Sequence, residues 1–228
     1  MSVAARTRTL AFLFDIDGTL ITTGGAGAVA WRRAFDELHG IPADIGKFTD
    51  AGMTDPEVGR LTFASVIGRE PTIDELARVM AKRLDYLPEA VAESKGYEVL
   101  PGVAELLPRL AEAGYLLGLT TGGVEDAARI KLDRAGLNKY FSFGGYGSDS
   151  PDRAELTRRG IERARGVHGG RLDSSRCVVV GDTPLDISAA HAAEAVAVGV
   201  ASGHFNVDEL RAAGADYVLA SLEEELPI

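Results

Sequence analysis

The sequence predicts an α/β protein with a doubly wound, mostly parallel sheet and an inserted domain made of α-helices. Two observations support this fold class. Short apolar runs alternate with helical patterns over most of the chain, which is typical of a parallel sheet covered by helices. One stretch breaks this alternation and shows helical patterns alone. We therefore expect an α/β core formed by residues 1–21 and 97–228, and a helical cap formed by residues 22–96.

The core elements follow one another as strand and helix. Several of the helical patterns end at a glycine, which suits a left-handed helix terminus, and Asn206 with Glu209 forms a capping box at the start of the last one. The expected helices span residues 101–115, 124–137, 152–165 and 206–215. The expected strands are Leu10–Phe14, Tyr115–Thr120, Arg176–Val180, Ala195–Gly199 and Tyr217–Leu219.

The inserted region contains three helical patterns, at residues 28–41, 55–67 and 72–94, and no convincing strand. Its ends fall in TTGGAG and near SKGYEVLPG, two glycine-containing stretches that could act as hinges. Asp55 precedes Pro56, and we expect it to cap the second helix.

Composition excludes several classes of function. The chain has 46% hydrophobic and 25% charged residues, which is ordinary for a folded globular protein. Lys and Arg number 24 against 34 Asp and Glu, so a nucleic-acid partner is not expected. No apolar run approaches the roughly 20 residues that span a bilayer, so no membrane partner is expected, and a single cysteine, Cys177, fits a reducing compartment. We expect a cytoplasmic location.

Polar residues follow three of the apolar runs. Asp15 ends the first, Thr121 follows the second, and Asp182 follows CVVVG, with Asp186 one helical turn later. Ligands bind beyond the carboxyl ends of parallel strands, so these side chains should meet at one edge. Clustered carboxylates repel one another unless a cation compensates, and oxygen ligands without His or Cys favour Mg²⁺. The backbone carbonyl of Asp17 is a further candidate ligand.

Asp15 and Asp17 are two residues apart, so in extended backbone both side chains point the same way. One carboxylate could act as a nucleophile and the other as an acid and base. Gly18 and Thr19 would form the tight turn that follows, with backbone N–H groups suited to phosphate oxygens.

These motifs resemble those of the haloacid dehalogenase superfamily, in its phosphatase branch with a helical cap (phosphoglycolate phosphatase-like). The resemblance rests on DIDGTL, the Thr in LTTGG, and GDTPLD, in that order, and it covers essentially the whole chain. It implies a Rossmann-like core and a Mg²⁺-dependent phosphatase that hydrolyses a small-molecule phosphate monoester through a phosphoaspartyl intermediate.

The resemblance also implies a role for each matching residue. Asp15 would be the nucleophile and Asp17 the general acid and then base. The phosphoryl group would bind Gly18, Thr19, Thr121 and Gly122, and the metal would bind Asp15, Asp17, Asp182 and Asp186. Thr54, in the loop before the second cap helix, is a candidate for substrate contact.

The third motif of the family, a Lys or Arg that neutralises the phosphoryl group and the nucleophile, has two candidates here. Arg153 lies near the start of a helix in the expected order, whereas Lys131 lies two turns into the helix after Thr121 and could reach back. Lys131 is slightly favoured, because the run around it resembles a branch in which that Lys recurs.

The sequence is compatible with other functions. A sugar phosphomutase has the same fold and motifs, whereas a phospho-acceptor signalling domain is about half this length and places its acidic pair differently. A dehalogenase would need neither Asp17 nor the pair Asp182 and Asp186. The four histidines, His39, His168, His191 and His204, share no metal-ligand spacing and are expected to be ordinary surface or helix residues. The natural substrate and the oligomeric state do not follow from the sequence.

Overall fold

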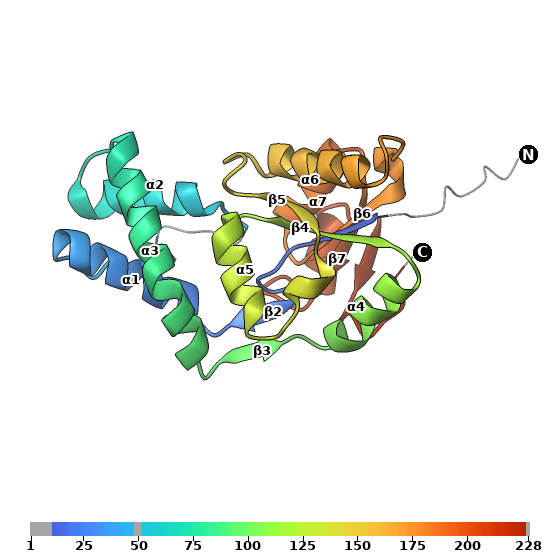
Figure 1. The fold of residues 1–228 in the computed structure, drawn as a ribbon, viewed down its shortest axis with the longest axis horizontal. Helices are drawn as coiled ribbons and strands as arrows, with labels where there is room; N and C mark the ends of the chain where they lie inside the picture. Colours follow the sequence, from blue (N-terminus) through green and yellow to red (C-terminus); the bar gives the residue numbers. More distant parts are fainter. Residues whose placement is uncertain (1–10, 48–51, 227–228) are drawn as a thin grey trace, which may run out of the picture.

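A computed structural model describes residues 11–47 and 52–226 of the chain. Its centre is a six-stranded, fully parallel sheet with the strand order β5-β4-β1-β6-β7-β8 (Figure 1). This order places β1, the first strand in the sequence, in the middle of the sheet. The strands are β1 (Ala11–Phe14), β4 (Leu116–Thr121), β5 (Phe143–Tyr146), β6 (Cys177–Gly181), β7 (Val196–Val200) and β8 (Tyr217–Leu219).

Helices cover both faces of this sheet. Alternate residues of β1 point to opposite faces: Phe12 and Phe14 pack with α4 (Val103–Glu112) and α5 (Glu125–Asp133). Ala11 and Leu13 pack on the other side, in a cluster that includes residues of α6 (Arg153–Val167), α7 (Pro184–Ala192) and α8 (Val207–Ala212). The doubly wound fold class expected from the sequence is confirmed.

The register of the sheet brings the expected site residues together. Phe14 is paired with Leu119 of β4 and with Val180 of β6. Asp15 follows Phe14 directly, and its N–H donates to the Val180 carbonyl at 2.9 Å. Thr121 and Asp182 each lie two residues beyond the partners of Phe14, so all three residues lie at the same edge of the sheet.

The three remaining helices lie to one side of the sheet (Figure 1). They are α1 (Ala26–His39), α2 (Asp55–Ile67) and α3 (Ile73–Glu93), and they match the three helical patterns expected there. Trp31, Phe35, Phe63 and Val79 form a hydrophobic cluster of their own between these helices. We call residues 22–96 the cap below.

Three strands differ from the expectation. The cap region was expected to hold helices only, but β2 (Ile21–Thr23) extends into it and pairs in antiparallel fashion with β3 (Tyr97–Val99). Gly24 has a φ of +57°, and a Cβ atom there would overlap the backbone of Gly96. The two glycine-containing linkers are therefore in close contact.

Strand β5 was missed because its sequence, FGGY, has a low strand propensity. Its glycines have a packing reason. A Cβ atom at Gly145 would overlap the backbone carbonyl of Leu156, so this glycine lets α6 lie directly against the sheet.

The start of α2 also differs. The N-cap residue is Thr54, and neither its side chain nor that of Asp55 caps the helix. The expectation that Asp55 is the capping residue is therefore wrong, and its carboxylate has other partners, described below.

Candidate active site

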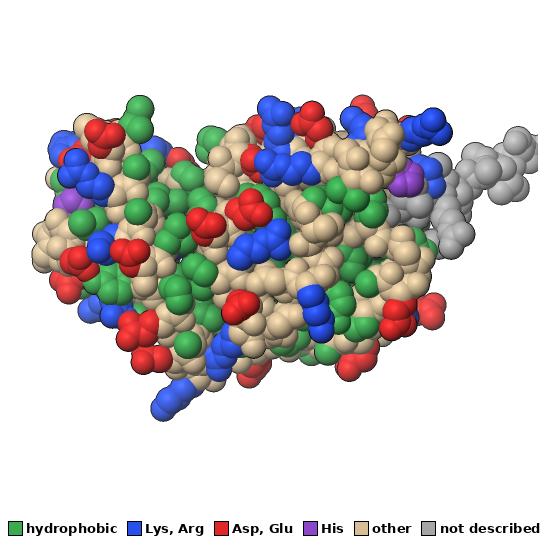
Figure 2. All heavy atoms as spheres, in the orientation of Figure 1, with side chains coloured by type: hydrophobic (Ala, Val, Ile, Leu, Met, Phe, Trp, Pro, Cys, Tyr) green, Lys and Arg blue, Asp and Glu red, His purple; other side chains and the backbone are tan. Residues whose placement is uncertain are grey.

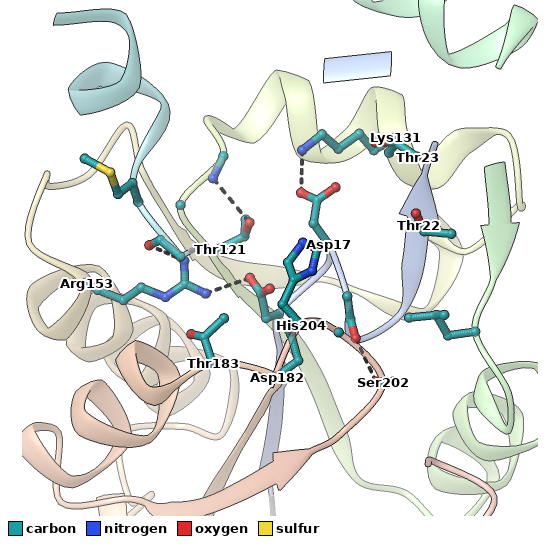
Figure 3. A pocket seen from close by; sticks show the side chains of 18 of the residues that line it. Asp17, Thr22, Thr23, Thr121, Lys131, Arg153, Asp182, Thr183, Ser202 and His204 are labelled. Carbon is teal, nitrogen blue, oxygen red and sulfur yellow. Dashed lines mark hydrogen bonds and ion pairs between the residues drawn. The ribbon is translucent and has the colours of Figure 1, made fainter. Parts of the chain in front are cut away.

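A cavity of about 500 Å³ opens at the carboxyl ends of β1, β4 and β6. The core and the cap both contribute to its walls. Asp15, Asp17, Thr121 and Asp182 line it from the core, and Met53 and Asp55 line it from the cap. Figure 3 shows the side chains of Asp17, Thr121 and Asp182 around one space, together with those of Lys131 and Arg153.

Three buried carboxylates lie close together at this edge of the sheet. Asp15, Asp182 and Asp186 each offer an oxygen atom, and these atoms lie within 4.8 Å of one another. Burial, together with repulsion from Asp186 and Asp17, raises the pKa of Asp15, although Arg153 counteracts this. Burial and the charges of Asp15 and Asp186 likewise raise the pKa of Asp182. A cation that binds here would relieve this repulsion.

Glycines allow Asp182 to occupy its place. A Cβ atom at Gly18 or at Gly203 would overlap the Asp182 carboxylate. Gly18 also has a φ of +86°, a conformation that favours glycine. The hydroxyl of Thr19 donates to Oδ1 of Asp182 at 3.2 Å and fixes its orientation.

The turn after β1 does not match the expectation for its amides. The N–H of Gly18 donates to the Ile21 carbonyl at 2.9 Å, and the N–H of Thr19 to the Ile16 carbonyl at 3.4 Å. Both amides are therefore engaged within the turn, and the expectation that they are free for phosphate oxygens is wrong. Ser202 adds a hydrogen bond from its hydroxyl to the Gly18 carbonyl at 2.7 Å.

Arg153, the first residue of α6, lies between two of the carboxylates. Its Nη2 donates to Oδ1 of Asp15 at 2.7 Å and also contacts Oδ1 of Asp186, and its Nε donates to that same Asp186 oxygen at 2.9 Å. Its Nη1 donates to the carbonyl of Gly52, in the cap, at 3.2 Å. The guanidinium is buried, so it supplies a fixed positive charge beside Asp15.

Lys131, on α5, has a different partner. Its ammonium lies 2.5 Å from Oδ2 of Asp17, a carboxylate whose side chain is 45% exposed (Figure 3). Asp15 and Asp17 thus face the same cavity with separate basic partners.

Asp186 lines no part of the cavity surface. Its Oδ1 pairs with Arg153, and its Oδ2 accepts hydrogen bonds from the N–H and the hydroxyl of Thr183 in a capping box at the start of α7. A Cβ atom at Gly181 would overlap Asp186, so close packing holds this carboxylate as well.

Thr121 and Gly122, the candidates for phosphoryl binding in LTTGG, lie where the cap contacts the core. The Thr121 hydroxyl accepts a hydrogen bond from the N–H of Gly123 at 3.2 Å. The Gly122 carbonyl accepts one from the N–H of Asp55 at 2.8 Å, and a Cβ atom at Gly122 would overlap the carbonyl of Met53. A glycine at 122 therefore allows the cap loop to approach the cavity.

Thr54 does not reach the cavity. It is buried, it is not among the residues that line the cavity, and its hydroxyl has no hydrogen-bond partner within residues 11–47 and 52–226.

Several residues that line the cavity were not predicted to be site residues, and two of them are ionisable. Asp55 lines it from the cap, and His204, which was expected to be an ordinary surface or helix residue, lines it from the loop after β7 (Figure 3). Neither has a local motif that would mark it, because each reaches the cavity only through the tertiary fold.

The donor set fits a hard divalent cation. It consists of the carboxylates of Asp15, Asp182 and Asp186, and His204 is not part of this cluster. The glycines that surround Asp182 hold its carboxylate close to that of Asp15, as a shared cation requires.

The fold and the site define a class of protein: a doubly wound parallel sheet with an acidic cluster at the carboxyl ends of its strands and a helical insertion beside them. A family model described as haloacid dehalogenase-like hydrolase matches residues 9–194. Validoxylamine A 7'-phosphate phosphatase of Streptomyces hygroscopicus subsp. limoneus is 30% identical over 221 residues, covering 93% of each chain. A phosphoglycolate phosphatase of Rhodospirillum rubrum is 31% identical over 206 residues, covering 85% of this chain and 80% of that one.

A solved structure titled β-phosphoglucomutase, from Clostridium difficile, has the same fold. Its TM-score is 0.69 at 21% identity, and the match covers 94% of this chain and 92% of that one. The chain belongs to the haloacid dehalogenase-like hydrolases, and it is a phosphatase of that family. Within the part of the chain that the structure describes, no helix is both long and apolar enough to cross a membrane.

Proposed function

We propose that this protein is a Mg²⁺-dependent phosphatase that hydrolyses a small-molecule phosphate monoester through a phosphoaspartyl intermediate at Asp15. The observation that carries the proposal is the pairing of the buried Asp15 with Arg153 at the floor of a cavity that Asp17 also lines. A bound Mg²⁺ would be held by Asp15, Asp182 and the backbone of Asp17, and it would offset negative charge on the phosphoryl group. Asp186 would hold Arg153 in place and add negative charge to the metal site.

In the proposed mechanism, a carboxylate oxygen of Asp15 attacks phosphorus, and the bond from phosphorus to the ester oxygen breaks. Asp17 gives its proton to the departing alcohol oxygen. The carboxylate of Asp17 then takes a proton from water as that water attacks the phosphoaspartate, which releases phosphate and restores Asp15. Lys131 holds Asp17 in place through its 2.5 Å contact.

We assign the neutralising role of the third motif to Arg153 rather than to Lys131. Arg153 contacts the nucleophile directly, and its planar guanidinium can bind a carboxylate and a phosphoryl oxygen at once. Lys131 contacts the proposed acid and base instead.

We also propose that residues 22–96 close over the cavity and exclude water during the reaction. Their two linkers run together, since the hydroxyl of Ser94 donates to the Thr23 carbonyl at 2.8 Å. A Gly24→Ala substitution places a Cβ atom against Gly96 and should change kcat and KM together, whereas Gly27→Ala, which meets no atom within 4 Å, should not. Unchanged kinetics in Gly24→Ala would contradict this assignment.

The experiment that tests the function is phosphate release from an activated aryl phosphate and from a panel of sugar phosphates. Turnover should disappear in EDTA and return with Mg²⁺, and Ca²⁺ should support little of it, because its larger and looser coordination suits the site poorly. Full turnover by metal-free protein would refute the metal dependence. Conversion of a hexose 1-phosphate to its 6-phosphate, without release of phosphate, would indicate a mutase instead.

A further inference from the structure

We propose that this cavity selects phosphate monoesters whose alcohol portion is uncharged or cationic and discriminates against those that carry a carboxylate. The inference rests on the proposed phosphatase function and specifies its substrate class. It follows from the charges that face the cavity and from the partners that these charges already have.

The Lys and Arg side chains of the cavity are both paired with carboxylates of the reaction centre. Among the described residues that line it, Lys131 and Arg153 are the only Lys or Arg. Lys131 is paired with Asp17, and Arg153 with Asp15 and Asp186. The segment 48–51, which precedes the cap residues of the wall, reads FTDA and contains no Lys or Arg in its sequence. A carboxylate on the alcohol portion would therefore meet no available Lys or Arg among the described residues, and His204 is the one further basic side chain of that lining.

The cap wall presents an acid where such a cation would be useful. Asp55 lines the cavity, and its Oδ2 accepts hydrogen bonds from Nη1 of Arg83 at 2.6 Å and from the N–H of Val124 at 2.9 Å. Arg83 neutralises the charge of Asp55 from the side away from the cavity. It is 1% exposed, does not line the cavity, and packs 4.9 Å from the ring of Trp31. The substrate thus faces the carboxylate and not the guanidinium.

Burying a carboxylate without a cationic partner is costly, and an opposing carboxylate adds repulsion. A hydroxyl or an ammonium group is favoured instead, because it can donate to the Asp55 carboxylate or to the hydroxyls of Thr22 and Thr23, which also line the cavity. The asymmetry acts on the alcohol portion only, since the phosphoryl group is served by Arg153 and the metal.

Three phosphates of equal chain length test this inference: 2-phosphoglycolate, 2-hydroxyethyl phosphate and 2-aminoethyl phosphate. Each carries a two-carbon alcohol, and they differ in the charge at its end. We expect kcat/KM for 2-phosphoglycolate to be at least about tenfold below that of the other two. An activated aryl phosphate, measured in parallel with Mg²⁺, reports whether the protein is a phosphatase at all.

A gain-of-function variant makes the test sharper. Met53→Lys places a cation on the cap wall and should raise the ratio of kcat/KM for 2-phosphoglycolate to that for 2-hydroxyethyl phosphate at least about tenfold. Ile73→Lys is the matched control: it adds the same charge at a position of the cap that is 88% exposed and does not line the cavity, and it should leave the ratio unchanged.

Equal or better use of 2-phosphoglycolate by the unmodified protein, or a ratio that does not respond to Met53→Lys, would overturn the inference. If no phosphate is released even from the aryl ester, the proposed function fails instead. Calorimetric binding of the three phosphates to the Asp15→Asn protein with Mg²⁺ then still decides the question, with weaker binding of 2-phosphoglycolate expected and equal binding contradicting it.

Discussion

Replacing Arg153 with Met should destabilise the protein strongly, whereas replacing Lys131 with Met should barely affect its stability. Both substitutions remove one positive charge from the same cavity and leave an apolar side chain of similar length. They differ in the surroundings of the partner that loses its counter-charge.

The expected magnitudes follow from burial. The side chains of Arg153, Asp15 and Asp186 are 7%, 8% and 2% exposed. Removing one partner of a buried ion pair costs about 3–5 kcal/mol of unfolding free energy. Lys131 is paired with Asp17, whose side chain is 45% exposed. Water can therefore solvate Asp17, and a pair of this kind is worth about 0–1 kcal/mol.

Thermal unfolding in EDTA measures the difference directly. For a chain of this length each kcal/mol shifts Tm by about 2–4 °C, so Arg153→Met should lower Tm by roughly 6–20 °C and Lys131→Met by about 0–4 °C. Arg153→Lys keeps the charge but loses the planar fork that reaches both Asp15 and Asp186, and it should fall between the two.

Activity supplies an independent comparison. Arg153→Met should reduce kcat by at least about 100-fold. This is the usual effect of removing a hydrogen-bond donor that stabilises the negative charge of the transition state. Equal shifts in Tm for Arg153→Met and Lys131→Met, or a larger shift for Lys131→Met, would show that burial of the carboxylate partner does not set the cost of losing the positive charge. Retained activity in Arg153→Met would refute the proposed role of its charge.

Two further predictions concern close packing and thiol chemistry. Gly203→Ala should weaken Mg²⁺ binding by about 10- to 100-fold in a calorimetric titration, because the added Cβ atom would overlap the Asp182 carboxylate. Gly166→Ala, at a helical position where a Cβ atom meets no atom within 4 Å, should leave the affinity unchanged, and equal affinities of the two variants would contradict this prediction. Burial raises the pKa of Cys177 to about 12, so iodoacetamide at pH 8 should label this thiol only after denaturation. Intact-protein mass measures the labelling, and rapid labelling of the native protein would show that the thiol is accessible.

Much of the fold could be predicted because its elements carry local signals. Five of the six parallel strands are apolar runs, and their expected bounds are within one residue of the observed ones over the described positions. The three cap helices have clear periodicity. Strand β5 gives no such signal, because the property that matters at Gly145 is close approach to α6, which exists only in the folded chain.

The same distinction between local and tertiary signals applies to the site residues. The acidic cluster was predictable, since Asp15 and Asp182 follow apolar strands that the topology makes neighbours. The partners of long or distant side chains were not, because sequence order does not show that Arg153 reaches Asp15 while Lys131 reaches Asp17. Asp55 looked like an ordinary helix cap for the same reason.

Phosphorylation of Asp15 during turnover can be detected as added intact-protein mass after brief exposure to an activated aryl phosphate and a rapid acid quench. Asp17→Asn keeps the nucleophile but lacks the group that activates water, so with a leaving group that needs little protonation the intermediate should accumulate as one added phosphoryl group. Asp15→Asn should show no added mass. A phosphoryl adduct on Asp15→Asn would place the nucleophile elsewhere, and no adduct on any variant alongside normal turnover by the unmodified protein would contradict the covalent mechanism.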